Sequence, residues 1–275
     1  MSAVVLAGAT SGLGRQAALQ LAKDGHELTF IGRNRERGER LARETGGRFI
    51  RADLSTLEGV EHVAATVSQV DVLINNAGVM TRRREVTAEG FELNLAVHHL
   101  APFSLTSRLL PLLRRGEGRV VNVNSEGHRA PMRGSGPVLI NFDDLQSERS
   151  FDPFLTYSRT KLANLLFTYE LHRRHPELTV AAVHPGVVRT DLGRQFPRAL
   201  VALFHITALS ARQGAAPVVE LATSPDIANG AYYSRFTNTR SSPASYDVGT
   251  ARRLWEVTEE LRGPFAVTGQ LRGPS

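Results

Sequence analysis

Short apolar runs rich in β-branched residues alternate along this chain with longer segments in which apolar positions recur every three or four residues. The short runs lie at residues 3–9, 27–32, 47–53, 71–78, 118–125, 178–186 and 230–235. They have the length and composition of buried strands, whereas the longer segments have the periodicity of amphipathic helices. This alternation predicts βαβ units with right-handed crossovers, and therefore an α/β fold with a doubly wound parallel sheet flanked by helices.

The same pattern continues along the chain without a break that would mark a second domain. No fixed-period repeat or low-complexity linker is present, and residues 134–137 and 241–245, which are rich in Gly, Pro and Ser, have the character of loops. With 275 residues, 41% of them apolar, the chain is long enough to bury a substantial core. We expect a single domain over residues 1–275.

Composition excludes several classes of site. The chain has no cysteine, which rules out disulfides, thiolate metal sites and cysteine nucleophiles. His172 and His175 lack acidic or cysteine companions at metal spacing, so we expect no metal site. The first residues do not resemble a signal peptide, and no apolar window reaches the roughly 18 residues of a membrane span. We expect a cytoplasmic protein that does not span a membrane.

The net charge of +6 raises the question of nucleic-acid binding. Basic clusters occur at residues 81–85, 112–116 and 172–175. They are scattered along the chain and no aromatic residues interleave with them, so the pattern favours solvated helix faces over a nucleic-acid surface.

A glycine-rich turn joins the first predicted strand to the first predicted helix. Its residues are Gly8, Thr10, Ser11, Gly12, Leu13 and Gly14, with Ala9 between them. Glycine lets the main chain approach a pyrophosphate closely, and the free N–H groups at a helix N-terminus stabilise its negative charge. A plain tight turn is the alternative, but the position between strand and helix favours a dinucleotide site.

The ends of the second and third predicted strands suggest which dinucleotide binds. Arg33 and Asn34 follow the second strand, where dinucleotide folds usually carry an acid that binds the ribose 2′-hydroxyl. A guanidinium pairs well with a phosphate, so Arg33 favours NADP over NAD, unless it is simply a surface residue or another arginine of residues 33–40 takes that role. Asp53 ends the third strand and is placed to bind the adenine amine, with Leu54 packing on the ring, although a helix N-cap is a competing explanation for Asp53.

Tyr157 and Lys161 stand four residues apart in a predicted helix, and Lys161 is one of only two lysines in a chain otherwise basic through arginine. This spacing places both side chains on one helix face. Hydride transfer to a carbonyl requires a proton for the forming alkoxide, and a nearby ammonium, with the positive nicotinamide of an oxidised coenzyme, lowers the pKa of a phenol. Taken alone, this spacing is as typical of two unrelated surface residues as of a catalytic pair.

The combination of these motifs resembles the short-chain dehydrogenase/reductase family. It comprises the glycine turn, Asn75-Asn76-Ala77-Gly78, Ser125, Tyr157-x-x-x-Lys161 and Pro185-Gly186. The resemblance runs from Ala3 to about Tyr233, and segments such as residues 140–151, 161–171 and 184–193 are most similar to the retinol-dehydrogenase and WW-domain-oxidoreductase branch. It implies a Rossmann-type sheet, NADP and carbonyl chemistry.

The resemblance also implies roles for individual residues. Tyr157 would act as general acid or base, Lys161 would lower its pKa and hold the nicotinamide ribose, and Ser125 would bind the substrate oxygen. Residues implied to line the coenzyme cleft are Asn75, Ala77, Gly78, Pro185, Gly186, Val188 and Thr190. The predicted function is hydride transfer between nicotinamide and a small apolar carbonyl or alcohol substrate. The alternative is a catalytically silent nucleotide-binding redox sensor or scaffold.

One position departs from the family pattern. The family's helix asparagine, which supports a water linked to the lysine, falls on His98. A neutral imidazole has one donor and one acceptor, so we expect His98 to occupy this relay position and to add pH sensitivity. Asn94, one turn earlier, is the other candidate, and simple packing of His98 is the third reading.

Residues 190–213 are expected to form the substrate-binding segment, and residues 235–275 a C-terminal extension. The first segment carries an apolar stripe at helical spacing that suits a hydrophobic substrate, although core packing explains it equally: Leu192, Phe196, Leu200, Leu203 and Phe204. Family members commonly associate through the helices near residues 100 and 160, which implies a homodimer or homotetramer, although this branch includes monomers.

Overall fold

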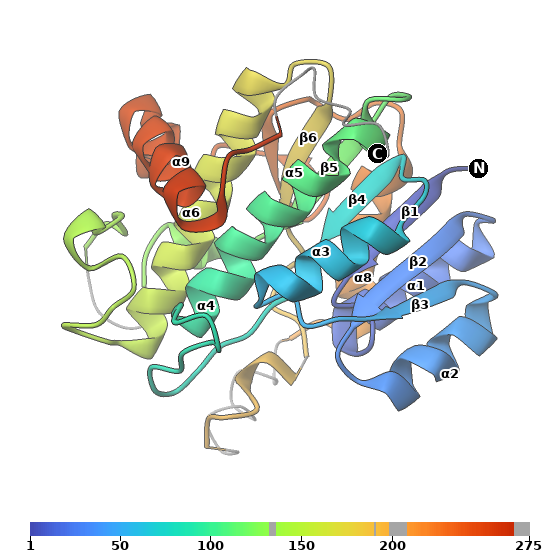
Figure 1. Ribbon diagram of the computed structural model, residues 1–275, viewed down its shortest axis with the longest axis horizontal. Helices are drawn as coiled ribbons and strands as arrows, with labels where there is room; N and C mark the ends of the chain where they lie inside the picture. Colours follow the sequence, from blue (N-terminus) through green and yellow to red (C-terminus); the bar gives the residue numbers. More distant parts are fainter. Residues whose placement is uncertain (132–135, 190, 198–207, 267–275) are drawn as a thin grey trace, which may run out of the picture.

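The computed structural model describes residues 1–131, 136–189, 191–197 and 208–266. Through these residues runs an eight-stranded sheet in the order β3-β2-β1-β4-β5-β6-β7-β8 (Figure 1). The strands are β1 (Ala3–Ala7), β2 (Glu27–Gly32), β3 (Arg48–Arg51), β4 (Val72–Asn75), β5 (Arg119–Val123), β6 (Thr179–His184), β7 (Ala231–Ser234) and β8 (Thr237–Asn238). All pair in parallel except β8, which is antiparallel to β7. The seven predicted strands and the doubly wound sheet are confirmed.

Helices cover both faces of the sheet (Figure 1). One face carries α1 (Gly12–Lys23), α2 (Arg35–Thr45) and α8 (Ala211–Thr223), and the other carries α3 (Leu57–Thr66), α5 (Ala101–Leu113) and α6 (Pro153–Arg174). None of the helices in the described part of the chain is long and apolar enough to cross a bilayer.

The period of two along each strand creates two separate cores. In β1, Val5 and Ala7 belong to the core under α3, α5 and α6, whereas Val4 and Leu6 belong to the core under α1 and α8. Such alternation explains why these strands appear as continuous apolar runs in the sequence, since both faces are buried.

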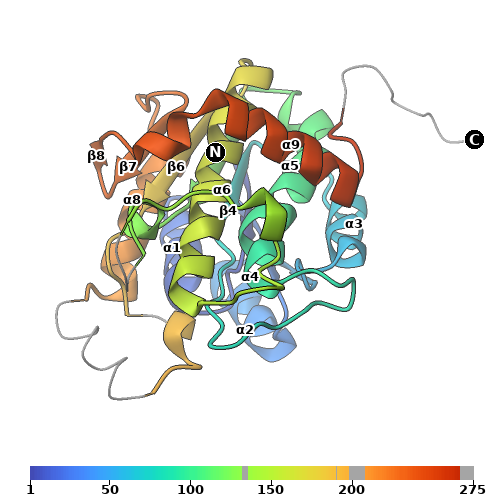
Figure 2. The same cartoon turned by 90° about the vertical axis from the view of Figure 1, so that its left-hand side faces the viewer.

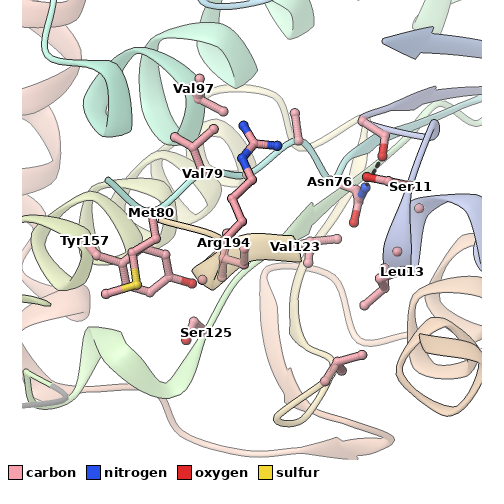
Figure 3. Close-up of a pocket in the computed structure, with 18 of the residues that line it drawn as sticks. Ser11, Leu13, Asn76, Val79, Met80, Val97, Val123, Ser125, Tyr157 and Arg194 are labelled. Carbon is pink, nitrogen blue, oxygen red and sulfur yellow. Dashed lines mark hydrogen bonds between the residues drawn. The ribbon is translucent and has the colours of Figure 1, made fainter. Parts of the chain in front are cut away.

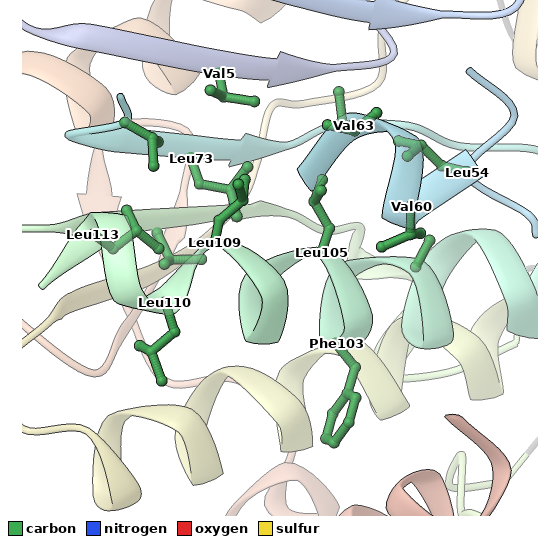
Figure 4. Close-up of a cluster of buried hydrophobic side chains, with 14 of the residues drawn as sticks. Val5, Leu54, Val60, Val63, Leu73, Phe103, Leu105, Leu109, Leu110 and Leu113 are labelled. Carbon is green, nitrogen blue, oxygen red and sulfur yellow. The ribbon is translucent and has the colours of Figure 1, made fainter. Parts of the chain in front are cut away.

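Helix α5 packs on the sheet beside α3, and its other side meets Phe167 of α6 and Trp255 of the C-terminal part of the chain, so it is apolar on both sides. Figure 4 shows Leu105 and Leu109 pointing toward the sheet, while Phe103 and Leu110 point the opposite way. All four are at most 1% exposed. Each contributes roughly 1.5–3 kcal/mol through burial, which anchors the helices that carry the site residues.

A π-helical turn interrupts the long helix that contains α5. The helix starts as α4 (Leu93–Leu95), continues through the π-helical segment η1 (Ala96–Leu100) and then becomes α5. Glu92 caps its beginning, with its carboxylate accepting hydrogen bonds from the N–H groups of Asn94 and Leu95 at 2.9 and 2.7 Å. Turns of this kind frequently occur at functional sites.

The described part of the predicted C-terminal extension packs on the domain instead of projecting from it. Its helix α9 (Val248–Arg262) lies against α5 and α6 (Figure 2). The Trp255 ring contacts Phe103 and Phe167 at centroid distances of 4.9 and 6.0 Å. A hydrogen bond of 2.8 Å joins Thr258 to His99 of η1. The outer face of the α5–α6 pair is therefore covered by the chain itself.

Candidate active site

A cavity of about 470 Å³ opens at the carboxyl ends of the parallel strands. In doubly wound sheets this is the edge where ligands bind. The structure brings most of the predicted site residues together on its walls: Gly8, Thr10, Ser11, Gly12, Leu13, Gly14, Arg33, Asp53, Leu54, Ala77, Gly78, Ser125, Tyr157, Lys161, Pro185, Gly186 and Val188.

Three predicted residues lie outside the cavity wall, and one lies outside the described residues. The side-chain oxygen of Asn34 accepts from the Arg37 N–H at 2.8 Å, so Asn34 caps α2 instead of facing the cavity. Asn75 is buried behind the wall, where its amide donates to the Asn122 side chain at 2.9 Å. His98 is also buried and absent from the wall. Thr190 is the residue that the structure does not describe.

The glycine turn leaves no room for a side chain at Gly8 or Gly14. A Cβ on Gly14 would lie 2.3 Å from the Gly8 carbonyl oxygen, and Gly8 itself has a φ of +72°. Helix α1 starts at Ser11 without a side-chain cap and without an acid in its first turn. The N–H groups of its first turn are thus available to an anion in the cavity.

Asn76 is a site residue that the sequence reasoning missed. Its side-chain amide donates to the carbonyl oxygens of Ala7 and Gly8 at 3.1 and 3.0 Å, and it lines the cavity. It fastens the end of β4 to the glycine turn. Successive side chains of an extended segment point to opposite sides, so Asn76 faces the turn while its neighbour Asn75 is buried. That alternation was the signal in the sequence that could have identified Asn76.

Arg33 and Asp53 stand together at the end of the cavity formed by β2 and β3. The guanidinium Nη1 lies 3.9 Å from Asp53 Oδ2, and both side chains are about half exposed, at 51% and 46%. The other Asp53 oxygen accepts from the N–H and hydroxyl of Ser55 at 3.0 and 2.8 Å. Asp53 therefore shapes the turn before α3, whose N-cap is Thr56. One oxygen of Asp53 and the Arg33 guanidinium stay accessible to a ligand.

Tyr157 and Ser125 meet on the opposite wall. Tyr157 is 5% exposed, and Ser125 follows β5 with its hydroxyl accepting from the Gly127 N–H at 3.2 Å. Burial raises the pKa of Tyr157 to about 12, against the opposing effect of its hydrogen bond with the Ser125 side chain. Figure 3 shows both side chains reaching the same region of the cavity.

Lys161 follows Tyr157 by about one turn of α6 and is 6% exposed. Its ammonium donates to the Val123 carbonyl oxygen at 3.1 Å and lies 5.8 Å from the centre of the Tyr157 ring. Burial lowers the pKa of Lys161 to about 8. In the protein alone, burial raises the pKa of Tyr157, and the hydrogen bond with Ser125 is what acts against that rise, so the expected lowering by Lys161 stays a prediction for the coenzyme-bound enzyme.

Asn124 connects these groups and was also missed by the sequence reasoning. Its side-chain oxygen accepts from the Ser125 N–H at 2.7 Å. Its amide donates to the Lys161 carbonyl oxygen at 3.0 Å and to the Asn164 side chain at 2.8 Å. One buried amide therefore fixes the backbone at two of the three proposed catalytic residues. An amide residue directly before the predicted serine was the available signal.

His98 packs against Tyr157, and among the described residues no hydrogen bond joins its side chain to Lys161. Its ring packs edge-on against the Tyr157 ring at 5.3 Å. Its Nε2 accepts from the Val79 N–H at 3.1 Å, so Nδ1 carries the proton and donates to Thr160 at 2.8 Å. Burial holds the pKa of His98 well below 6.5. The predicted relay role remains a prediction, and both ring nitrogens already have partners.

Asn94, the alternative relay residue, is engaged elsewhere too. It is 1% exposed, and its amide donates to the side chains of Thr81 and Glu92 at 2.8 and 2.6 Å. Neither candidate therefore reaches Lys161 through the hydrogen bonds of its side chain.

Apolar side chains surround the region in front of Tyr157. Met80, Phe154 and Tyr157 form a cluster against which Leu192 and Phe196 pack, and the rings of Phe154 and Phe196 are 5.6 Å apart. The other members of the predicted stripe, Leu200, Leu203 and Phe204, lie outside the described residues. Within the described ranges, no group of three or more potential ligand residues is arranged to hold a metal ion.

Comparison with known proteins agrees with this geometry. The family model for short chain dehydrogenases matches residues 2–137. Retinol dehydrogenase 14 of Mus musculus is 36% identical over 292 residues, which cover 94% of this chain and 85% of that protein. Retinol dehydrogenase 12 of Homo sapiens is 37% identical over 278 residues, covering 94% and 86%. A Streptomyces sp. (strain C5) protein provisionally named daunorubicin C-13 ketoreductase DnrU is 35% identical over 279 residues, covering 96% and 93%.

A solved structure has the same architecture over almost the full chain. The crystal structure of an uncharacterized protein from Mycobacterium paratuberculosis superposes with a TM-score of 0.81 and 34% sequence identity. The match covers 97% of this chain and 96% of that one.

Proposed function

The chain belongs to the short-chain dehydrogenase/reductase family and is an oxidoreductase of its retinol dehydrogenase branch; from this premise we propose that it is an NADP-dependent enzyme acting on small apolar carbonyl or alcohol substrates. One observation carries the proposal. Tyr157, Ser125 and Lys161 line the same cavity as the glycine turn, so a dinucleotide bound at the turn extends toward the phenol.

The residues present fit a nicotinamide coenzyme. The turn has the close approach that only glycine permits, and α1 has uncapped N–H donors for a pyrophosphate. Asp53 and Leu54 supply an acceptor and an apolar surface for an adenine ring at the far end. When bound, the coenzyme supplies or accepts the hydride.

The proposed preference for NADP rests on Arg33. Its guanidinium is half exposed and lies at the β2 end of the cavity, where the ribose 2′-position of a dinucleotide is expected. Asp53, at 3.9 Å, holds it only loosely. A 2′-phosphate would gain a bidentate partner there, whereas NAD would gain no carboxylate contact with its 2′-hydroxyl from this residue.

The proton chemistry follows from the pKa values of the buried pair. With a pKa of about 12, Tyr157 keeps its proton at neutral pH and can donate it to a carbonyl oxygen that Ser125 holds by its hydroxyl. Lys161, with a pKa of about 8, exchanges protons near neutral pH, and its ammonium lies 5.8 Å from the centre of the phenol ring. This arrangement favours carbonyl reduction, the direction that consumes the phenol proton.

The proposed substrate class follows from the cluster in front of Tyr157. Met80, Phe154, Leu192 and Phe196 give that region an apolar lining, which suits a hydrophobic carbonyl compound. The names of the retinol dehydrogenases and the ketoreductase among the relatives also indicate alcohols and ketones.

A silent nucleotide-binding scaffold is the alternative function. Burial of Lys161 and Tyr157 argues against it, because a buried lysine destabilises a fold and a protein that only binds nucleotide gains nothing from the pair.

The test is the change in nicotinamide absorbance with a panel of apolar aldehydes, ketones and quinones, offering NADPH and NADH separately. We expect faster reduction with NADPH, and reversal of this preference in Arg33→Asp. Arg35→Asp, an exposed change two residues away on α2, is the matched control and should keep the preference. Equal use of both coenzymes by the wild type would contradict the role of Arg33, and an absence of turnover with every substrate would favour the scaffold.

A further inference from the structure

Three of the described residues that line the cavity carry a basic side chain that is mainly positive at neutral pH: Arg33, Lys161 and Arg194. His184 also lines it, but burial lowers the pKa of His184 to about 4, so it is neutral at physiological pH. Arg33 and Lys161 have proposed roles at the two ends of the coenzyme. Arg194 has none, and the sequence motifs did not single it out.

Arg194 follows the short helix η4 (Asp191–Gly193) and is exposed. Figure 3 shows its side chain extending into the cavity, with the guanidinium directed to the region beside Val79, between the Tyr157 wall and the turn that carries Ser11. Within the described part of the chain, its guanidinium forms no ion pair with a carboxylate. The charge is therefore available to an anion in the middle of the cavity.

The glycine turn itself offers no unpaired cationic side chain to a diphosphate. The turn contributes neutral N–H groups, and the arginine in the first turn of α1, Arg15, is already paired with Glu44. A dinucleotide diphosphate carries about two negative charges, which need a partner on the side away from the turn. A guanidinium matches two phosphate oxygens in its plane.

We propose that Arg194 binds the coenzyme diphosphate from the side of the cavity opposite the glycine turn. This inference rests on the proposed function, since it assumes that the cavity holds a nicotinamide dinucleotide. It adds a third cationic contact between Arg33 at the adenosine end and Lys161 at the nicotinamide end.

The same contact would connect coenzyme binding to the substrate wall. The neighbouring Gln195 accepts from the Arg82 N–H at 2.9 Å and donates to Glu85 at 2.8 Å, which ties the segment across the cavity mouth. Leu192 and Phe196, on either side of Arg194, form part of the apolar wall. A diphosphate held by Arg194 therefore stabilises the segment that contacts the substrate.

The experiment measures binding of two coenzyme fragments by calorimetry, without turnover. The fragment 2′-phospho-ADP-ribose contains the diphosphate, whereas 2′-AMP lacks it. We expect Arg194→Gln to weaken binding of 2′-phospho-ADP-ribose about 10-fold or more, as for loss of hydrogen bonds to a charged group, and to change binding of 2′-AMP less than about twofold. Arg33→Gln should weaken both fragments, and the exposed Arg83→Gln, outside the cavity, should weaken neither.

Unchanged binding of 2′-phospho-ADP-ribose in Arg194→Gln would overturn the inference. If that result came with a raised KM for carboxylate-bearing ketones only, Arg194 would instead recognise an anionic substrate. Thermal melting of each variant checks that it is folded. We expect Arg194→Gln to melt like the wild type, because Arg194 is exposed and its replacement removes no core contact. Failure of the wild type to bind either fragment would contradict the proposed function, which separates the two outcomes.

Discussion

Replacing Lys161 with methionine should stabilise the coenzyme-free protein while it abolishes turnover. Burial lowers the pKa of Lys161 from its ordinary value of 10.5 to about 8. Since the folded pKa lies below the unfolded value, the unfolded chain binds more protons between about pH 8 and pH 10.5. Stability therefore rises with pH across that window, and the full penalty of the buried charge is present below it.

The size of the effect follows from the pKa difference. It corresponds to about 3 kcal/mol at neutral pH. Methionine also removes the hydrogen bond to the Val123 carbonyl oxygen, which costs about 1 kcal/mol. Lys161→Met should therefore gain about 2 kcal/mol, or roughly 4–8 °C in melting temperature for a chain of this size.

The assay is thermal melting of coenzyme-free protein by circular dichroism at pH 7 and pH 10.5. The advantage of Lys161→Met should be largest at pH 7 and should disappear at the higher pH, where the lysine is largely neutral. Lys23→Met changes the only other lysine, which is exposed at the end of α1, and should give no stabilisation at either pH. A Lys161→Met protein that melts at or below the wild type at pH 7 would refute the reasoning.

Three further outcomes are expected. Tyr157→Phe should lower carbonyl reduction about 10²–10⁴-fold in steady-state assays while its affinity for NADPH stays within about twofold; full turnover would rule out the phenol as proton donor. Gly14→Ala should weaken NADPH binding in fluorescence titrations, because the new Cβ would lie 2.3 Å from a carbonyl oxygen of the turn; Gly116→Ala, where nothing lies within 4 Å, is the control, and equal affinities would contradict the close approach. Asn124→Ala should lower kcat more than it raises KM, because it releases the backbone of two catalytic residues. Asn122→Ala, two residues earlier in β5 and also bonded to α6, should cost stability without that kcat effect, and equal kcat losses would indicate a purely structural role.

The sheet could be predicted from the sequence because its signals are local. Each buried strand appears as an apolar run, and the structure places a strand within every predicted run. The predicted runs extend past the strand ends, since residues such as Asp53 and Gly78 belong to the turns beyond the last paired position. Strand β8 has only two residues, both exposed, so no apolar pattern marks it.

The cavity wall could be predicted where motifs sit directly at strand ends, and less well elsewhere. Asn34 and Asn75 were assigned to the coenzyme, and the structure places both outside the cavity wall, where Asn34 caps α2 and Asn75 bonds to Asn122 inside the sheet. The direction of the His98 ring depends on the π-helical turn at Ala96–Leu100. The apolar periodicity of the sequence does not predict such a turn. Arg194 depends on the path of a loop, which local pattern does not determine.

Helix α9 has a consequence for how copies of this chain can meet. The surface formed by α5 and α6 near Phe103 and Phe167 already has an occupant, and that occupant comes from the same polypeptide. A second molecule cannot dock at that spot without first displacing the Trp255 side chain. A homodimer or homotetramer of this chain would therefore either use another part of the exterior or include α9 itself in the contact.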